Sequence, residues 1–540
     1  GIGWNQYRGH LGRSMTSDSS LPITWGHNEN VLWRTELKGR GTSSPVIYQN
    51  KVFLTASSRI NTTESIAGDA NNLTHHVICI DCTTGKYLWI RDIQVPSSPQ
   101  KQHEGGQQQR FSASTPVVDE NRVYTFFGAA GVFAFDHSGT LDWQADVGSQ
   151  TDGYNKSASL ILHNNLLIVN ASVESESIYA IDKYTGIGAW KIDGIEKSYS
   201  TPVLGVTTKG DRELIILEKD FVRAYDPDSG KEIWFCEGIH DEVASTPFVK
   251  MGVCFCNGGV PNQMMAIKIG GRGDVTDSHK LWEVPQGARV ASPIYLSGQI
   301  YLLGDNGRMQ CFDSRDGSLI SQTQLATEAT TYASPLFSSN LLYIPTEDKG
   351  VFVCEATSDL ETISHNTIDG DDNLLEASFA ASGRLLFLRN DQYIYCIGAT
   401  EDLPIEVQLK AFQSSGDLIQ TRSRYESKTI DAEQKYTFRL TDQPEKIATS
   451  LIAPFKAILS DKQELLAKKI ISQKSMQFAE LLKQHRNAYW EFLQSGSHND
   501  DELLSELKRI ERESYKLGTK IHLEIKQKVL TQQQRESLSD

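Results

Sequence analysis

Short runs of β-branched and aromatic residues recur through the first 400 residues, with apolar and polar positions alternating inside them. Lys51–Leu54 and Arg122–Phe126 are two examples, and Gly, Asn, Asp and Ser separate such runs. This pattern is typical of short β-strands bounded by turns. The first part of the chain is therefore predicted to be all-β.

A phrase of two small residues, a proline and an apolar residue returns through the same region. Its copies are Ser43-Ser44-Pro45-Val46, Ser114-Thr115-Pro116-Val117, Ser200-Thr201-Pro202-Val203, Ser245-Thr246-Pro247-Phe248, Ala291-Ser292-Pro293-Ile294 and Ala333-Ser334-Pro335-Leu336, with degenerate copies at Ser157-Ala158-Ser159-Leu160 and Ala377-Ser378-Phe379. Successive copies lie 42 to 46 residues apart, except for a first step of 71 residues. Eight copies of one unit are therefore predicted, the first with a long insertion.

A second phrase follows each copy: an apolar run ending in Asp, a Gly turn and then Trp. Val132 to Trp143, Ile178 to Trp190 and Val222 to Trp234 are examples. Each unit therefore reads as four short antiparallel strands. Four-stranded units at this period predict an eight-bladed β-propeller over residues 25–399.

The two ends of the repeat region predict how the ring closes. The eighth unit ends at Ile394–Gly398 and lacks its Trp strand, whereas Val31–Thr35 carries an unassigned Trp33. We expect this N-terminal strand to complete the last blade, because pairing removes the open edge that the ring would otherwise leave.

The eight cysteines are predicted to be structural thiols. Cys79, Cys311 and Cys396 occupy the repeat position that Ala holds at residues 134, 180, 224 and 266, which indicates a buried site for a small side chain. Cys79 and Cys82 have the spacing of a redox or metal pair, but no second pair completes a site.

The character of the chain changes after Gly398. Residues 1–24 are predicted to be an N-terminal extension, 400–441 a linker with short strands at Pro404–Leu409 and Tyr436–Leu440, and 442–540 a helical hairpin or bundle. Two apolar stripes at helical spacing support the helical domain, since each stripe must bury against something. Their residues are Ile452, Phe455, Ile458 and Leu459, and Leu503, Leu504, Leu507 and Ile510.

The charge balance narrows the classes of partner. The formal net charge of −15 argues against nucleic-acid binding, which depends on an excess of Lys and Arg. No stretch of eighteen apolar residues exists, so no transmembrane helix is expected. The sequence starts at Gly1 without Met, which a cleaved signal peptide or a shortened chain would explain.

The repeat from Ile181–Gly186 to Trp190 resembles the tryptophan-docking motif of the pyrroloquinoline-quinone (PQQ) propeller superfamily. That superfamily includes quinoprotein dehydrogenases and cofactor-free BamB-like envelope proteins. Trp4–Gly9 and the loop Gly270–Val275 look like PQQ-like propellers common in planctomycete bacteria. The resemblance implies a periplasmic or cell-envelope protein that is exported with a cleaved signal peptide.

Two phrases in the helical region, Leu459–Gln463 and Leu530–Gln534, look like the LTxxQ motif of the Spy/CpxP family of periplasmic helical proteins. Ser or Thr caps a helix in this motif, and Gln three residues later closes a capping box. The first copy departs from the family by having Ser460 in place of Thr. Any capped amphipathic helix can also produce the phrase. The resemblance implies binding of apolar or unfolded protein surfaces.

One rim of the ring is predicted to be the working face. With strands A to D running from the inside outwards, the B–C and D–A connections of every blade lie on one rim, and both are lengthened in the first blade, at Ser57–His76 and Val95–Phe111. Eight residues just before the inner strands are candidates for binding a ligand at the propeller mouth: Arg40, Arg110, Lys156, Lys197, Glu242, Arg289, Tyr332 and Glu376. Five of them are cationic, which would suit an anionic ligand or a carboxylate-bearing peptide. The alternative to a ligand site is that these residues are polar only because the mouth of a propeller is exposed to water.

No metal site is expected. His75-His76 and His103-Glu104 lie in the two insertions, where histidines are usually just solvated. Loop Gly270–Lys280 is assigned to the opposite rim as a C–D connection of the fifth blade, and its Arg272-Gly273-Asp274 is interpreted as turn chemistry. Asp274 and Asp277 alone do not make a calcium cage.

Three functions can be compared on these residues. A PQQ-dependent dehydrogenase would be expected to carry a disulfide of two adjacent Cys over the quinone, and calcium held by Glu and Asn. The sequence has no adjacent Cys pair and no Cys-x-x-Cys-His haem site. Glu242 or Glu376 could serve as a calcium ligand. A glycan-binding propeller would need a Trp cluster on the rim, whereas the Trp residues fall at repeat positions. The sequence therefore predicts a non-catalytic envelope scaffold that holds protein partners without PQQ, calcium or another cofactor.

Overall fold

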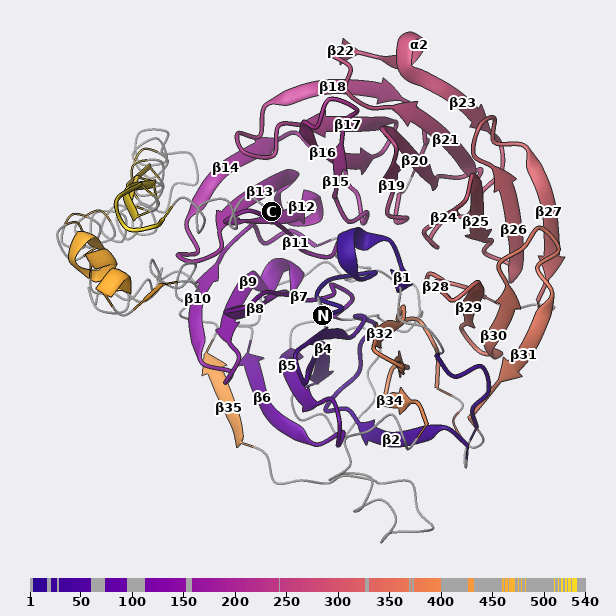
Figure 1. The fold of residues 1–540 in the computed structure, drawn as a ribbon, viewed down its shortest axis with the longest axis horizontal. Helices are drawn as coiled ribbons and strands as arrows, with labels where there is room; N and C mark the ends of the chain where they lie inside the picture. The colour runs from indigo at the N-terminus through magenta and orange to yellow at the C-terminus, as the bar shows by residue number, and fades with distance from the viewer. Residues whose placement is uncertain are drawn as a thin grey trace, which may run out of the picture.

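The computed structural model describes residues 3–16, 21–26, 29–59, 73–94, 112–151, 158–241, 243–325, 330–368, 371, 373–399 and 426–431, together with scattered positions between 459 and 531. Eight sheets stand around a common axis, each built on four antiparallel strands from the inside outwards (Figure 1). The predicted eight-bladed β-propeller is confirmed.

The strands of blades 1 to 4 follow the chain in order. They are β3 (Val46–Tyr48), β4 (Lys51–Arg59), β5 (Leu73–Asp81) and β6 (Tyr87–Gln94); β7 (Val117–Val118), β8 (Arg122–Phe126), β9 (Val132–Asp136) and β10 (Leu141–Ala145); β11 (Ile161–His163), β12 (Leu166–Ala171), β13 (Ser177–Asp182) and β14 (Gly188–Asp193); and β15 (Val203–Val206), β16 (Arg212–Glu218), β17 (Phe221–Tyr225) and β18 (Glu232–Glu237).

Blades 5 to 8 continue the same order. They are β19 (Phe248–Lys250), β20 (Val253–Gly258), β21 (Gln263–Lys268) and β23 (Lys280–Val284); β24 (Ile294–Leu296), β25 (Gln299–Leu303), β26 (Arg308–Asp313) and β27 (Leu319–Gln324); β28 (Leu336–Ser338), β29 (Leu341–Thr346), β30 (Gly350–Glu355) and β31 (Thr362–Asn366); and β32 (Ala380–Ser382), β33 (Leu385–Arg389) and β34 (Tyr393–Ile397), completed by β2 (Val31–Glu36). Short helical turns are η1 (His10–Gly12), η3 (Gly128–Ala130), α1 (Ser172–Ser175) and α2 (Thr276–His279).

The last blade closes as predicted. Strand β2 pairs antiparallel with β34, and Trp33 stands opposite Cys396. Its side chain is fully buried and packs against Phe387, with ring centroids 5.9 Å apart. The N-terminal strand therefore supplies the outer strand of blade 8 and joins the two ends of the ring.

Tryptophan side chains link neighbouring blades. The indole N–H of Trp33 in blade 8 donates to the carbonyl of Cys82 in blade 1 (3.1 Å), and Trp143 in blade 2 donates to the carbonyl of Lys183 in blade 3 (3.0 Å). The ring of Trp33 lies against Gly85, whose φ of 68° and lack of a Cβ admit this contact. Trp89, Trp190 and Trp282 bond to the next blade in the same way.

Blade 4 uses a different link. The indole of Trp234 donates to the buried Glu213 carboxylate (2.8 Å), which also accepts from the backbone N–H of Gly270 (3.2 Å). Glu213 thereby holds the loop Gly270–Lys280, which connects strands C and D of blade 5 as predicted. Within this loop β22 (Gly273–Asp274) pairs parallel with β18. Arg272-Gly273-Asp274 therefore belongs to an added fifth strand of blade 4 and its approach rather than to a simple turn.

Two further segments add a strand to a blade. Strand β1 (Met15–Thr16) pairs parallel with the inner strand β28, and β35 (Glu426–Asp431) pairs parallel with the outer strand β6. The sequence did not predict β35, which lies in the polar stretch between Pro404–Leu409 and Tyr436–Leu440; those two predicted strands lie outside the described residues.

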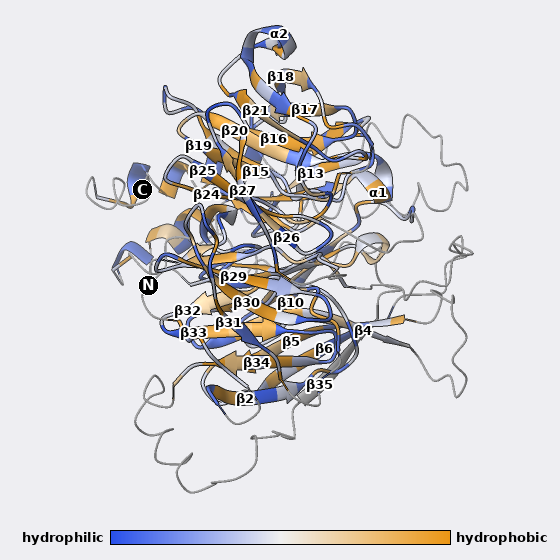
Figure 2. Ribbon diagram, turned by 90° about the vertical axis from the view of Figure 1, so that its right-hand side faces the viewer, coloured by the Kyte–Doolittle hydropathy of each residue, from blue (hydrophilic) through white to orange (hydrophobic). Residues whose placement is uncertain are grey.

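The core lies between blades rather than in one central mass. Phe53, Cys79 and Trp89 of blade 1 pack with Phe133 and Phe135 of blade 2, and apolar strands of this kind run through the whole ring (Figure 2). The shared Ala/Cys position is confirmed as buried: Cys79 faces Trp89. Ala134, Ala180, Ala224 and Ala266 likewise face the Trp of their own blades. All eight cysteines are buried and free, as predicted.

The described positions between Ser460 and Val529 include helical turns. The carboxamide oxygen of Gln463 accepts from the Ser460 backbone N–H (3.0 Å), which is the predicted capping contact. The Gln463 side-chain N–H donates to the Val529 carbonyl (2.8 Å), and Lys474 pairs with Glu524. These two contacts place the two described helical stretches antiparallel to each other. None of the helices among the described residues is long and apolar enough to cross a membrane.

Candidate binding rim and central channel

The N-terminal segment lies inside the ring, against the inner strands (Figure 1). Backbone N–H groups of Ile47, Val118 and Phe337, in blades 1, 2 and 7, donate to the carbonyls of Trp4, Asn5 and Ser14 at 2.7, 2.8 and 2.9 Å. The turn η1 contacts β15 of blade 4. Residues 4–16, which we call the channel segment, therefore cross the central channel of the propeller. The sequence analysis assigned no segment of the chain to this channel.

Arg8 is the central side chain of the channel segment. It is fully buried, and its Nη2 donates to the carbonyl of Pro293 in blade 6 (2.5 Å). Burial lowers the pKa of Arg8 to about 10, which still leaves the guanidinium charged at neutral pH. Gly9 lies against the Trp4 ring with φ 70°, a close approach that a Cβ would block. Sequence reasoning noted Trp4–Gly9 only as a resemblance and did not predict this role.

The five described candidates at the mouth all lie in D–A connections, which puts them on one rim. The Arg40 side chain is 64% exposed and pairs with Asp391 (2.7 Å). Lys197 and Arg289 are exposed, and the Arg289 backbone N–H donates to Asp305 (3.0 Å). Tyr332 and Glu376 are half-buried. Arg110, Lys156 and Glu242 lie outside the described residues.

The structure thus places cations and acids together on this rim, which we call the loop rim. Asp391 and Asp305 belong to B–C turns of blades 8 and 6 and face the D–A connections that carry Arg40 and Arg289. The described part of the rim is therefore of mixed charge.

Arg389 is a further residue near this rim that the sequence analysis missed. It ends β33, is fully buried, and donates through Nη1 to the carbonyl of Ser43 (2.7 Å) and to its hydroxyl (2.5 Å). Burial lowers the pKa of Arg389 to about 9, against the opposing effect of Asp391. Asn170 and Asn257 hold the entry to the next blade in the same way, through carbonyls of Ser200 and Ala291. Arg389 is therefore a clamp between blades 8 and 1.

Blade 1 projects beyond the other blades on the loop rim. Strands β4 and β5 are nine residues each and pair over their full length, from Lys51 opposite Asp81 to Arg59 opposite Leu73. Strand B has 5 residues in blade 2. Relative to blade 2, the extra residues lengthen this hairpin by about 13 Å at about 3.3 Å per residue. Figure 2 shows the end of β4 reaching out on the side that carries α1.

The predicted loop Ser57–His76 is therefore wrong at both ends, because Ser57 and His76 belong to paired strands. His75 is buried, bonds through Nδ1 to the Ser57 hydroxyl (2.7 Å) and stacks on Phe127. His76 is buried on the opposite face of the sheet and bonds to Asp92 (2.8 Å). His103-Glu104 lies outside the described residues. Among the residues that are described, no group of three His, Cys, Asp or Glu could hold a metal ion.

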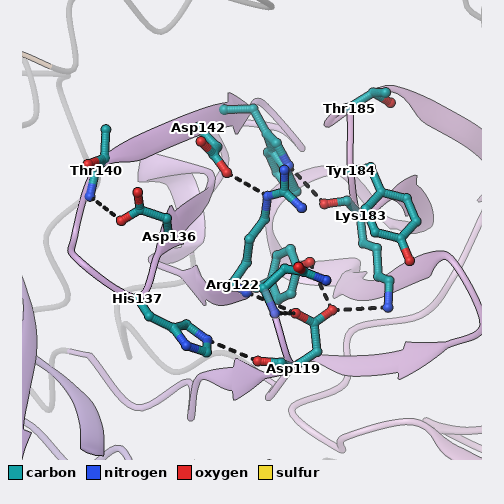
Figure 3. Close-up of polar contacts among 12 residues, drawn as sticks. Asp119, Arg122, Asp136, His137, Thr140, Asp142, Lys183, Tyr184 and Thr185 are labelled. Carbon is teal, nitrogen blue, oxygen red and sulfur yellow. Dashed lines mark hydrogen bonds and ion pairs between the residues drawn. The ribbon is translucent and has the colours of Figure 1, made fainter. Parts of the chain in front are cut away.

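On the opposite rim, a closed polar cluster joins blades 2 and 3 (Figure 3). Lys183 Nζ pairs with Asp119 Oδ2 (3.0 Å), and Tyr124 donates to the same oxygen (3.1 Å). Asp119 Oδ1 accepts the backbone N–H groups of Asn121 and Arg122, both at 2.9 Å. Both oxygens of this buried carboxylate are therefore used inside the protein, which indicates a structural link.

The direction of the pKa shifts in this cluster agrees with an ion pair. Burial raises the pKa of Asp119, but the Lys183 ammonium and the hydrogen bonds from the backbone N–H groups of Asn121 and Arg122 together outweigh burial and leave that pKa below its usual value. Burial lowers the pKa of Lys183, but the Asp119 carboxylate, together with Tyr184 and Glu120, outweighs burial and raises that pKa. Both groups are charged at neutral pH, so neither is poised to exchange a proton there.

The ring of eight blades with docked tryptophans defines a PQQ-like β-propeller. The family model described as "Outer membrane protein assembly factor BamB" matches residues 24–173, 73–318 and 174–401, which together span most of the chain. The chain therefore belongs to this family.

This chain is similar to many solved structures, among them the following two. BamB from Moraxella catarrhalis is 13% identical, with a TM-score of 0.43, and the match covers 64% of this chain and 96% of that one. The computationally designed Ika8 protein is 14% identical, with a TM-score of 0.47, and the match covers 68% of this chain and all of that one, 100%. The comparison with curated proteins finds no match.

The structure places most of the groups that a PQQ and calcium site would use, but Glu242 lies outside the described residues. The eight cysteines are buried at separate strand positions, and no two adjacent cysteines exist to form the disulfide expected over a quinone. Glu376 is half-buried in a D–A connection, and the described residues bring no group of three acidic, His or Cys ligands together there.

Proposed function

We propose that this protein is a scaffold of the cell envelope that holds protein partners on its loop rim. The observation that carries the proposal is the β4–β5 hairpin, which extends beyond the ring on the same rim as Arg40, Lys197 and Arg289. A projecting hairpin beside exposed charges offers a partner both shape and charge to recognise. Membership of a family described by outer-membrane protein assembly supports the compartment.

The channel segment supports a rim rather than a channel as the binding surface. The chain's own residues 4–16 bond to blades 1, 2, 6 and 7 across the axis. A partner would therefore meet a ring that is already braced from inside. Such a ring loses little conformational freedom on binding, which favours affinity.

The helical region is proposed to add a second binding surface. Its Ser460–Gln463 capping contact and its antiparallel stretches agree with the LTxxQ-type hairpin that the sequence resembles. Leu466 and Leu523 are exposed on the described helical positions, which suits contact with apolar segments of a partner.

Charge reversal on the two rims tests the proposal. The double variant Lys197→Glu and Arg289→Glu changes exposed residues of the loop rim, and the matched control Lys209→Glu and Lys231→Glu changes exposed residues in turns of the opposite rim. The measurement is recovery of the crosslinked partner complex from envelope preparations. We expect a loss of at least about tenfold for the loop-rim variant alone; equal recovery of both variants would contradict the proposal.

A further inference from the structure

Three strands of blade 1 carry a hydrogen-bonded chain of a serine, a histidine and an aspartate. Ser58 lies on β4, His76 on β5 and Asp92 on β6. The Ser58 hydroxyl lies 2.7 Å from His76 Nε2, and His76 Nδ1 lies 2.8 Å from Asp92 Oδ1. Asp92 stands directly opposite His76 in the sheet, and Ser58 pairs with Thr74 two residues before His76, so all three share one face.

The surroundings of Asp92 favour one tautomer of the neutral His76 ring. Lys38 Nζ bonds to Asp92 Oδ2 (2.6 Å). Burial raises the pKa of Asp92, but the hydrogen bonds from His76 and Lys38 outweigh burial and bring that pKa to about 2. The carboxylate is therefore ionised and must accept the proton on His76 Nδ1. In the neutral ring Nε2 is then an acceptor, so the Ser58 hydroxyl donates to it.

The three side chains differ in how far they are buried. His76 and Asp92 are buried, with side chains 1% and 11% exposed, whereas Ser58 is half-buried one residue before the end of the described hairpin. The histidine and aspartate are thus shielded from water, while the hydroxyl lies nearest to the loop rim. Gly39 packs against His76, since a Cβ on it would lie 3.1 Å from the His76 ring.

We propose that Ser58, His76 and Asp92 form a nucleophilic triad that cleaves esters of small acyl groups. Its pattern of contacts is the one that activates a serine: a hydroxyl on one ring nitrogen and a carboxylate on the other. This activity goes beyond partner binding and departs from the non-catalytic protein that the sequence predicts.

The reaction balances with water as the second substrate. Ser58 Oγ attacks the ester carbonyl carbon and its proton passes to His76 Nε2. The bond from that carbon to the alcohol oxygen breaks, and the leaving alcohol takes the proton from His76. Water then attacks the acyl-serine, gives its proton to His76, and Ser58 recovers that proton as the acid leaves. Asp92 is a positioning residue, since it holds the His76 ring and its tautomer.

The neighbouring serine provides a matched control. Ser57 and His75 lie one residue before Ser58 and His76 and point to the opposite face of the sheet. The Ser57 hydroxyl bonds to Nδ1 of His75 and also to the Ser112 hydroxyl (2.5 Å). In His76, by contrast, Nδ1 bonds to the Asp92 carboxylate. The two serine–histidine pairs on β4 and β5 therefore differ in the ring nitrogen that contacts the hydroxyl: Nδ1 in His75 and Nε2 in His76.

Covalent labelling of the full chain tests the triad. A fluorophosphonate probe should form one Ser58 Oγ–P bond as its P–F bond breaks and HF is released, and mass spectrometry should locate the adduct on Ser58. Ser58→Ala should abolish labelling, whereas Ser57→Ala should keep it. Asp92→Asn, which keeps the side-chain shape, should slow labelling by about 10³–10⁴-fold. Hydrolysis of p-nitrophenyl acetate should follow the same order.

Two results would overturn the triad. One is an unlabelled Ser58 in the folded wild-type chain under conditions that fully label a known serine esterase. The other is an unchanged labelling rate in Asp92→Asn. Thermal unfolding of each variant checks that it is folded.

Discussion

At the scale of single residues, buried charges in this ring tie one blade to the next. Lys183 of blade 3 pairs with Asp119 of blade 2, and Arg389 of blade 8 bonds to Ser43 at the entry to blade 1. A buried charge is tolerated only where partners replace its lost hydration. The Lys183–Asp119 pair meets this condition, whereas Arg389 is bonded only through Nη1, and its Nε and Nη2 have no partner among the described residues.

Removing one partner of the buried pair should be costly. Lys183→Met leaves Asp119 charged and buried, and we expect the free energy of unfolding to fall by about 3–5 kcal/mol. Denaturant unfolding measures the change. Arg315→Met, in an exposed pair with Asp313, is the control and should leave the midpoint nearly unchanged. Equal effects of the two substitutions would contradict a structural role for the buried pair.

Acid should remove the contribution of Asp92. Its pKa in the folded protein is about 2, below its usual value, so its ionised form stabilises the fold above about pH 4 and this stabilisation is lost as the pH falls through 2. The difference in unfolding free energy between wild type and Asp92→Asn should therefore be largest near neutral pH and shrink towards pH 2. A difference that stays constant with pH would show that the Asp92 charge is not responsible.

Much at this scale follows from sequence, but not all. The Ala/Cys position could be predicted because it repeats in register with each Trp. His75 and His76 were misplaced in a loop because the ends of β4 and β5 are polar, although the strands stay paired there. The chain of Ser58, His76 and Asp92 could not be found from spacing, since its members come from three strands and meet only through their register.

At the scale of elements, the docked tryptophans hold adjacent blades together. Trp33 is fully buried and combines three contacts: a hydrogen bond to Cys82, the Gly85 turn and the Phe387 ring. Trp190 makes the same hydrogen bond to Pro227 but is only half-buried. The closing strand therefore has the more tightly packed tryptophan.

Replacing Trp33 by Ala should destabilise the protein more than replacing Trp190 by Ala. Trp33→Ala should lower the free energy of unfolding by about 3–5 kcal/mol, and Trp190→Ala by clearly less, because less buried surface and a smaller cavity are involved. Denaturant unfolding of the two variants measures the difference. The opposite ranking would mean that closure of the ring does not depend on β2.

At the scale of the whole molecule, the number of blades could be predicted because the repeat occurs eight times. The closure by the N-terminus could be predicted because the last repeat lacks a Trp strand and an unassigned one precedes the first. The channel segment could not, since its contacts with blades 1, 2, 4, 6 and 7 are non-local and leave no pattern in the sequence. Strand β35 was missed because a strand that adds to an outer edge has no apolar alternation of its own here.

Removal of residues 1–16 tests the bracing role of the channel segment. The truncated chain keeps β2 and should still form the ring, but it loses the buried Arg8 and Trp4 and the backbone hydrogen bonds to three blades. We expect a lower melting temperature and faster hydrogen exchange at the amides of Ile47, Val118 and Phe337. Unchanged exchange at these three amides would show that the segment does not brace the inner strands.

The most direct test of the central claim is a photocrosslinking scan of the two rims in intact cells. A crosslinking amino acid replaces Lys197 or Arg289 on the loop rim, and Lys209 or Lys231 on the opposite rim, all of which are exposed. We expect a discrete crosslinked protein partner from the loop-rim positions and none from the opposite rim. Adducts of equal yield from both rims, or from neither, would contradict a scaffold that works through its loop rim.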